Sequence, residues 1–128
     1  MRWLLDTNII IDAFAGKALA VKALTKARSD AAEWVGYSAI TRLEVLGFAG
    51  LNAADDKGLR ELLDQFDEAS ITSAVIEEAI RIRKSSRIKA PDAIISATAI
   101  VFRAELVTRN TTDFKAVPHL TVIDPMNL

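Results

Sequence analysis

The sequence has no cysteine, so disulfide bonds and thiolate metal sites are excluded, as suits a reducing cytosol. It also lacks a hydrophobic run approaching the roughly 20 residues of a membrane-spanning helix, and the longest candidate, residues 90–102, contains Asp92. The apolar start of the chain is interrupted at Asp6, too early for a signal peptide. No repeat or Pro/Ser-rich linker divides the chain. We therefore expect one cytoplasmic domain spanning residues 1–128, with no membrane partner.

A strong charge of either sign is also missing, because 16 basic and 17 acidic residues leave a net charge of -1. A nucleic-acid partner would therefore have to bind a local basic patch. Hydrophobic residues make up 51% of the chain, which is high for a short soluble protein. Some apolar surface is thus expected to be buried against a partner, either a second copy or another protein.

Short β-rich runs alternate with helical stretches along the chain. Strands are expected over residues 2–5, 33–41, 68–73, 105–108 and 120–124, and helices over 7–14, 17–28, 41–50, 55–66, 73–87 and 91–104, with Ser73 as a helix cap. This alternation predicts an α/β fold with a central parallel β-sheet flanked by helices. Ligands of such sheets bind beyond the carboxyl ends of the strands.

Four acidic residues are expected at that edge of the sheet. Asp6 directly follows the first strand, and Glu44 lies one helical turn after the second. Asp92 opens a helix, and Asp113 comes shortly after Thr108, where a later strand ends. Carboxylates gathered in one cleft repel one another unless a cation lies between them. Oxygen ligands suit Mg²⁺ or Mn²⁺ rather than zinc, and such an ion can assist attack on a phosphate.

Each acid has a structural alternative as well. Thr41 and Glu44 have the spacing of a helix capping box. Asp92 would stabilise a helix start through the helix dipole, and Asp113 would suit a turn. Asp6 is harder to explain in this way, because a buried strand need not end in an acidic turn. The combination of four acids favours a metal site.

Four segments resemble the PIN-domain family, and within it the VapC-type toxins of bacterial toxin–antitoxin pairs. They are "LLDTNIIID", "SAITRLEVLGF", "APDAIISATAI" and "LVTRNTTDF". The resemblance implies a three-layer sandwich with a central parallel sheet, and the activity of an endoribonuclease dependent on Mg²⁺ or Mn²⁺. It further implies in-line hydrolysis of a phosphodiester bond by a metal-activated water, leaving 5′-phosphate and 3′-hydroxyl ends.

The resemblance also implies roles for individual residues. Asp6 and Asp92 would bind the ion directly, Glu44 directly or through water, and Asp113 would complete the site or hold a second ion. Nearby polar residues would orient these carboxylates or water; they are Thr7, Asn8, Thr41 and Asn110. Some relatives have an acid in place of Asn110, so the number of metal ions stays open.

Partners follow from the same resemblance and from charge. A basic patch beside Asp92 is expected to bind RNA phosphates, with a solvated helix face as the alternative; it comprises Arg81, Arg83, Lys84, Arg87 and Lys89, joined by Arg109 near Asp113. A cognate antitoxin is implied, whose arginine would enter the acidic pocket, together with a homodimer. Apolar residues of the early helices would line the antitoxin groove or the dimer interface, unless they form the core; they are Ile9, Ile10, Phe14, Leu19 and Leu24.

Other protein classes fit less well. A haloacid-dehalogenase phosphatase needs a second aspartate two residues after Asp6, where this chain has Asn8. A response-regulator receiver needs paired acids at the first strand and a late lysine. The chain is short for a DNA flap nuclease. A non-catalytic RNA- or protein-binding domain with the same fold remains an alternative, and the substrate could be transfer, ribosomal or messenger RNA.

Overall fold

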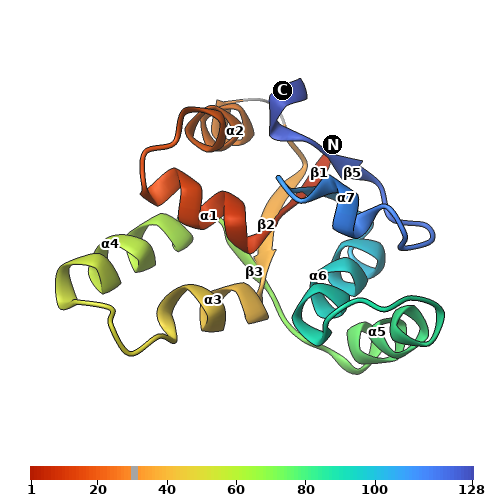
Figure 1. Ribbon diagram of the computed structural model, residues 1–128. Helices are drawn as coiled ribbons and strands as arrows, with labels where there is room; N and C mark the ends of the chain where they lie inside the picture. The colour runs from red at the N-terminus through yellow and green to blue at the C-terminus, as the bar shows by residue number, and fades with distance from the viewer. Residues whose placement is uncertain (30–31) are drawn as a thin grey trace.

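The fold is built on a five-stranded sheet, seen here in a computed structural model that describes residues 1–29 and 32–128. The strands are β1 (Arg2–Leu5), β2 (Trp34–Ser38), β3 (Asp67–Ala69), β4 (Glu105–Val107) and β5 (Val122–Ile123). Their spatial order is β3-β2-β1-β4-β5, and every neighbouring pair is parallel. Figure 1 shows the sheet between two groups of helices. The predicted α/β fold with a central parallel sheet is confirmed.

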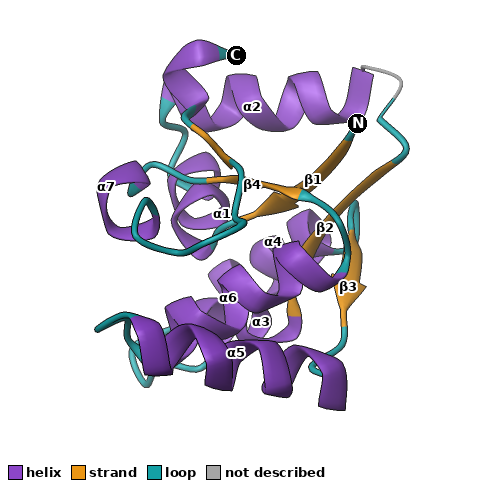
Figure 2. Ribbon diagram, turned by 90° about the vertical axis from the view of Figure 1, so that its right-hand side faces the viewer, coloured by secondary structure: helices purple, strands orange, loops and turns teal. Residues whose placement is uncertain are grey.

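The helices occupy the connections between the strands. They are α1 (Thr7–Phe14), α2 (Ala18–Ser29), α3 (Ala39–Leu46), α4 (Ala53–Leu63), α5 (Ser73–Ser85), α6 (Ala90–Val101) and the short α7 (Thr111–Phe114), followed by a 3₁₀ turn at Pro125–Asn127. None of the helices within the described ranges has the length and apolar character needed to cross a membrane. Figure 2 shows α2 on one side of the strands and α5 on the other.

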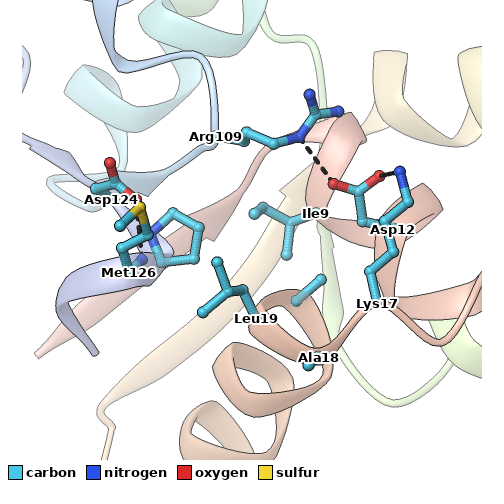
Figure 3. A pocket seen from close by; sticks show the side chains of 10 residues that line it. Ile9, Asp12, Lys17, Ala18, Leu19, Arg109, Asp124 and Met126 are labelled. Carbon is cyan, nitrogen blue, oxygen red and sulfur yellow. Dashed lines mark hydrogen bonds and ion pairs between the residues drawn. The ribbon is translucent and has the colours of Figure 1, made fainter.

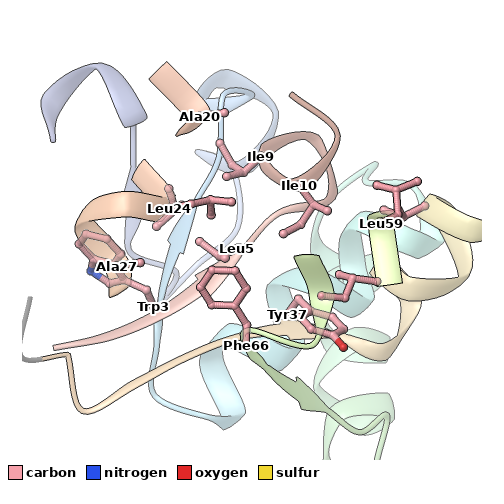
Figure 4. Packing of buried hydrophobic residues seen from close by; sticks show 13 residues of the cluster. Trp3, Leu5, Ile9, Ile10, Ala20, Leu24, Ala27, Tyr37, Leu59 and Phe66 are labelled. Carbon is pink, nitrogen blue, oxygen red and sulfur yellow. The ribbon is translucent and has the colours of Figure 1, made fainter. Parts of the chain in front are cut away.

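The alternating side chains of β1 divide the core between the two faces of the sheet. Trp3 and Leu5 pack on one face with residues of α1, α2 and α4, as Figure 4 shows. Leu4 points to the opposite face and packs with Ile95 of α6 and Phe114 of α7. Because β1 is buried on both faces, it lies in the middle of a three-layer sandwich.

The strand order reverses between β1 and β4. The chain runs from β1 through β2 to β3 on one side, and then crosses to place β4 and β5 on the other side of β1. The connections that follow β1 and β4 therefore lead toward opposite edges of the sheet. Ligands of open α/β sheets bind at such a point. The backbone N–H of Asp6 donates to the carbonyl of Val107 at 3.0 Å, so the carboxyl ends of the two strands are joined at this point.

Some predicted boundaries are wrong. The second strand ends at Ser38 rather than Thr41, because the Ser38 hydroxyl accepts a hydrogen bond from the N–H of Ile40 and caps α3. Thr72, not Ser73, caps α5 by accepting from the N–H of Val75. Neither α7 nor the final 3₁₀ turn was predicted, since segments this short carry no hydrophobic period.

The apolar residues of the early helices fall into two groups. Ile9, Ile10 and Leu24 are buried in the core, so for them the core alternative is correct. Phe14 and Leu19 are 40% and 47% exposed. Only these two of the five are therefore available to a partner.

Candidate active site

Asp6 occupies the junction between β1 and α1. Its backbone is extended (φ -68°, ψ 155°), and its Oδ1 accepts a hydrogen bond of 2.8 Å from the N–H of Thr7, which caps α1. The residue is only 4% exposed. Capping engages one carboxylate oxygen, so it does not explain why the second oxygen is also buried.

Thr108 binds that second oxygen, and sequence reasoning missed this role. Its hydroxyl donates to Asp6 Oδ2 at 2.7 Å. The Thr108 hydroxyl oxygen in turn accepts from the N–H of Asn110 at 3.0 Å and from Asn8 Nδ2 at 3.4 Å. Since a hydroxyl has one proton and two lone pairs, these two donors direct the Thr108 proton toward Asp6. The available signal was a hydroxyl residue at the carboxyl end of a predicted strand, residues 105–108.

The carboxylates at this edge influence one another electrostatically. Burial raises the pKa of Asp6 from 3.8 to about 6, against the lowering effect of the hydrogen bonds from Thr108 and Thr7, and the charges of Asp92 and Glu44 add to the increase. Burial also raises the pKa of Asp92, as do the charges of Glu44 and Asp113, while Lys89 lowers it. Asp92 is thus within electrostatic reach of the other three predicted acids, Asp6, Glu44 and Asp113.

Glu44 is oriented by a pair of threonine hydroxyls. Thr7 Oγ1 donates to Glu44 Oε1 at 2.7 Å and lies 2.9 Å from Thr41 Oγ1. Thr41 is fully buried inside α3, whose cap is Ser38, so the capping-box alternative for Glu44 is wrong. Glu44 itself is exposed on α3, with one oxygen held by a hydroxyl.

Asp92 and Asp113 each lie in the first turn of a helix. Asp92 is half-buried in α6, after Pro91, and Asp113 is exposed in α7. Both positions suit the helix dipole, so the structural alternative contributes to their placement. Asn110 precedes α7 and contacts Thr108 through its backbone N–H; its side chain makes no capping bond.

The donor set of this edge fits a hard divalent cation. Four carboxylates and neighbouring hydroxyls supply only oxygen ligands, and a cation would relieve the repulsion that raises the pKa of Asp6 and Asp92. Over residues 1–29 and 32–128, however, no three acidic or histidine side chains are already gathered closely enough to hold an ion. Binding would therefore require the exposed carboxylates of Glu44 and Asp113 to move toward Asp6 and Asp92.

The six predicted RNA-binding cations differ in their surroundings. Arg81 pairs with Glu78 at 2.8 Å, and Arg109 Nε donates to Asp12 Oδ2 at 2.9 Å. The other four are exposed along the end of α5 and the segment that leads to α6; they are Arg83, Lys84, Arg87 and Lys89. Lys89 directly precedes α6, the helix that carries Asp92. RNA binding by these residues stays a prediction.

Replacement of Thr108 tests its action on Asp6. Thr108→Val keeps the shape of the side chain and removes the hydrogen bond that lowers the pKa of Asp6, so this pKa should rise above about 6. The measurement is a carboxyl ¹³C NMR titration of the metal-free protein. Thr98→Val is the control, because Thr98 is also fully buried but bonds to the Ile94 carbonyl within α6. An unchanged Asp6 titration in Thr108→Val would contradict the assignment.

Comparison with known proteins gives one family and several similar structures. The PIN domain model matches residues 3–120. A toxin–antitoxin complex from Klebsiella pneumoniae contains a chain with 37% identity and a TM-score of 0.80, covering 95% of this chain and 96% of that one. The structure of FitAcB from Neisseria gonorrhoeae gives 31% identity, a TM-score of 0.78, and coverage of 98% and 99%.

A third structure, VapBC-1 from nontypeable Haemophilus influenzae, has a TM-score of 0.85 at 19% identity, covering 98% of this chain and 99% of that one. At that identity the likeness shows the fold alone. A search of curated proteins gave no significant match.

Proposed function

Because the chain belongs to the PIN domain family, we propose that its four acids form the centre of a metal-dependent endoribonuclease. The observation that carries the proposal is the buried carboxylate of Asp6, whose pKa of about 6 reflects burial together with the charges of Asp92 and Glu44. A carboxylate whose pKa is raised by burial and by specific charged neighbours is a candidate functional group. The nuclease activity of PIN-domain toxins agrees with this use.

The acids and the neighbouring threonines would have different roles at the site. Asp6 and Asp92 would hold Mg²⁺ or Mn²⁺ directly, with Glu44 and Asp113 completing the oxygen ligands. Such an ion, when bound, lowers the pKa of water and neutralises charge on phosphate oxygens. Thr108 and the N–H of Thr7 hold each Asp6 oxygen in place, which leaves the remaining lone pairs aimed in a fixed direction.

The substrate we propose is RNA, cut to leave 5′-phosphate and 3′-hydroxyl ends. The exposed cations at the end of α5 and in the segment before α6 would bind the phosphates of the RNA and direct the RNA chain toward Asp92. The positive field of Lys89 at Asp92 supports this path.

We further propose that the protein is a toxin inhibited by a cognate antitoxin. The likeness to the Klebsiella pneumoniae complex and to FitAcB supports this role, since both show over 30% identity along nearly the whole chain. Phe14 and Leu19 are available for such a partner or for a homodimer, and an antitoxin arginine would pair with the site carboxylates. The chain would act as a single cytoplasmic domain over residues 1–128.

The direct test uses purified protein free of antitoxin. It is incubated with total bacterial RNA and, separately, with single-stranded DNA, in Mg²⁺, in Mn²⁺ and in EDTA. We expect discrete RNA fragments that disappear with EDTA, intact DNA, and fragments with 5′-phosphate ends. Metal binding without cleavage of either nucleic acid would instead favour the non-catalytic binding domain.

A further inference from the structure

A buried acid outside the proposed ligand set links α1 to the segment that follows β4. Asp12 is 6% exposed, and its Oδ2 accepts from Arg109 Nε at 2.9 Å. Its Oδ1 lies 3.5 Å from Lys17 Nζ. Figure 3 shows these side chains together at one wall of a pocket of about 350 Å³. Neither contact belongs to a helix cap, so these ion pairs have another role.

Arg109 is held by α1 at two points. Its side chain binds Asp12, and its backbone N–H donates to Asn8 Oδ1 at 3.4 Å. Asn8 and Asp12 are four residues apart and therefore lie on the same face of α1. One helix face thus contacts both the side chain and the backbone of a single residue.

The residues on either side of Arg109 belong to the acidic site. Thr108 donates to Asp6, and Asn110 supplies a backbone N–H to the Thr108 hydroxyl. Asn110 also precedes α7, which carries Asp113. A shift of Arg109 would therefore disturb the hydrogen bond to Asp6 and the start of α7 together.

The environment of Asp12 makes this contact stronger than a surface ion pair. Apolar residues form much of the same pocket, among them Ile9, Leu19 and Pro125, and they limit the access of water to the carboxylate. A nearly buried carboxylate that loses Arg109 keeps the cost of burial, with only Lys17 at 3.5 Å left to compensate it. The buried carboxylate therefore holds Arg109 at its Nε, although the arginine side chain is itself 58% exposed.

We propose that Asp12 is a positioning residue, which acts through Arg109 to hold residues 108–110 so that Thr108 meets Asp6 and α7 presents Asp113. This inference rests on the proposed function of the site. It also gives Arg109 a different task from the RNA contact predicted by its sequence position. Arg109 holds the segment, while phosphate binding falls to the cations before α6.

The test uses Asp12→Asn, Arg109→Gln and the double variant that carries both of these substitutions. All three are compared with a control variant, Asp56→Asn. The last is the matched control, because Asp56 also pairs with an arginine, Arg60, at 2.7 Å, but on α4. Amide hydrogen exchange is measured on the metal-free proteins. We expect the amides of Arg109 and Asn110 to exchange at least about 10-fold faster in each single variant, no faster still in the double variant, and unchanged in the control.

A conservative variant and steady-state kinetics separate positioning from RNA contact. Arg109→Lys keeps a cation for Asp12 and should recover much of the protection. In cleavage assays, Asp12→Asn and Arg109→Gln should lower kcat to a similar extent with KM unchanged. A raised KM in Arg109→Gln alone would mean that Arg109 contacts RNA, and would overturn the proposal.

The exchange experiment does not depend on nuclease activity. Unchanged protection at residues 109 and 110, or equally faster exchange throughout the sheet, would overturn the positioning role. If the Asp12 and Arg109 variants lose protection only locally, but the wild-type protein cleaves no RNA, the positioning role is supported and the proposed function is rejected. The two failures are therefore distinguishable.

Discussion

Asp92→Asn is expected to reduce RNA cleavage at least about 1,000-fold at saturating Mg²⁺, which corresponds to about 4 kcal/mol of lost transition-state stabilisation. The substitution keeps the size of the side chain and removes one negative charge from the group that would hold the ion. Asp92 lies half-buried in the first turn of α6, within reach of the charges of Glu44 and Asp113. Single-turnover cleavage of the RNA identified in the initial assay measures the loss.

The control for this experiment is Asp55→Asn. Asp55 also lies in the first turn of a helix, α4, but is exposed and bonds only to Asn52 among the described residues. Both substitutions remove a favourable interaction with a helix dipole, worth about 0.3–1 kcal/mol, so neither should prevent folding. Cleavage by Asp92→Asn at the wild-type rate would show that this acid only stabilises α6, and the nuclease mechanism would be rejected.

Asp6→Asn is expected to stabilise the metal-free protein at pH 8 while abolishing its activity. The pKa of Asp6 is 3.8 in its ordinary state and about 6 in the folded protein, mainly because of burial. The folded state therefore binds more protons than the unfolded state between these values, so stability falls as the pH rises from 4 to 6 and stays lower above that range. The difference in pKa corresponds to about 3 kcal/mol, of which about 1–2 kcal/mol should remain as a net gain. The net gain in stability is smaller than the full difference because an amide nitrogen at this position cannot accept a hydrogen bond from Thr108.

Urea denaturation in EDTA at pH 8 and at pH 4 measures this gain. The advantage of Asp6→Asn should disappear at pH 4, where the wild-type carboxyl is already protonated in the folded state. Added Mg²⁺ should stabilise the wild type and leave the variant unaffected, because only a cation that binds the folded state shifts the equilibrium. Asp56→Asn serves as the control: it removes a charge that is paired with Arg60 on α4, outside the acidic site, and should bring no gain in stability at pH 8. A variant Asp6→Asn that is less stable than wild type at pH 8 would contradict the assignment.

The local sequence determined the fold class and the positions of the acids. A buried four-residue strand that ends in Asp6 and continues directly into a helix can place that carboxylate only at the carboxyl end of the strand. The Pro91–Asp92 pair likewise marks the start of α6, because proline and an acid both favour the first turn. These signals involve neighbours in the chain, so they are readable without knowledge of the tertiary structure.

Errors arose where two local signals competed. Thr41 and Glu44 have capping-box spacing, yet Ser38 caps the helix three residues earlier. Ser38 and Thr41 are both suitable caps for a helix that follows a β-rich run. The sequence alone does not show which hydroxyl caps the helix. In the folded protein, the buried Thr41 hydroxyl lies 2.9 Å from Thr7 Oγ1, and Ser38 caps α3.

Only the tertiary structure decided how the acids are held. Thr108 and Asp6 are 102 positions apart, and Arg109 and Asp12 are 97 positions apart. Both contacts exist because β4 lies next to β1, although β2 and β3 come between them in the chain. A hydrophobic pattern specifies that each strand is buried, but strand order depends on how the helices pack over the two faces of the sheet. The sequence by itself therefore determined which residues could form a site, and the adjacency of β1 and β4 determined which of them touch.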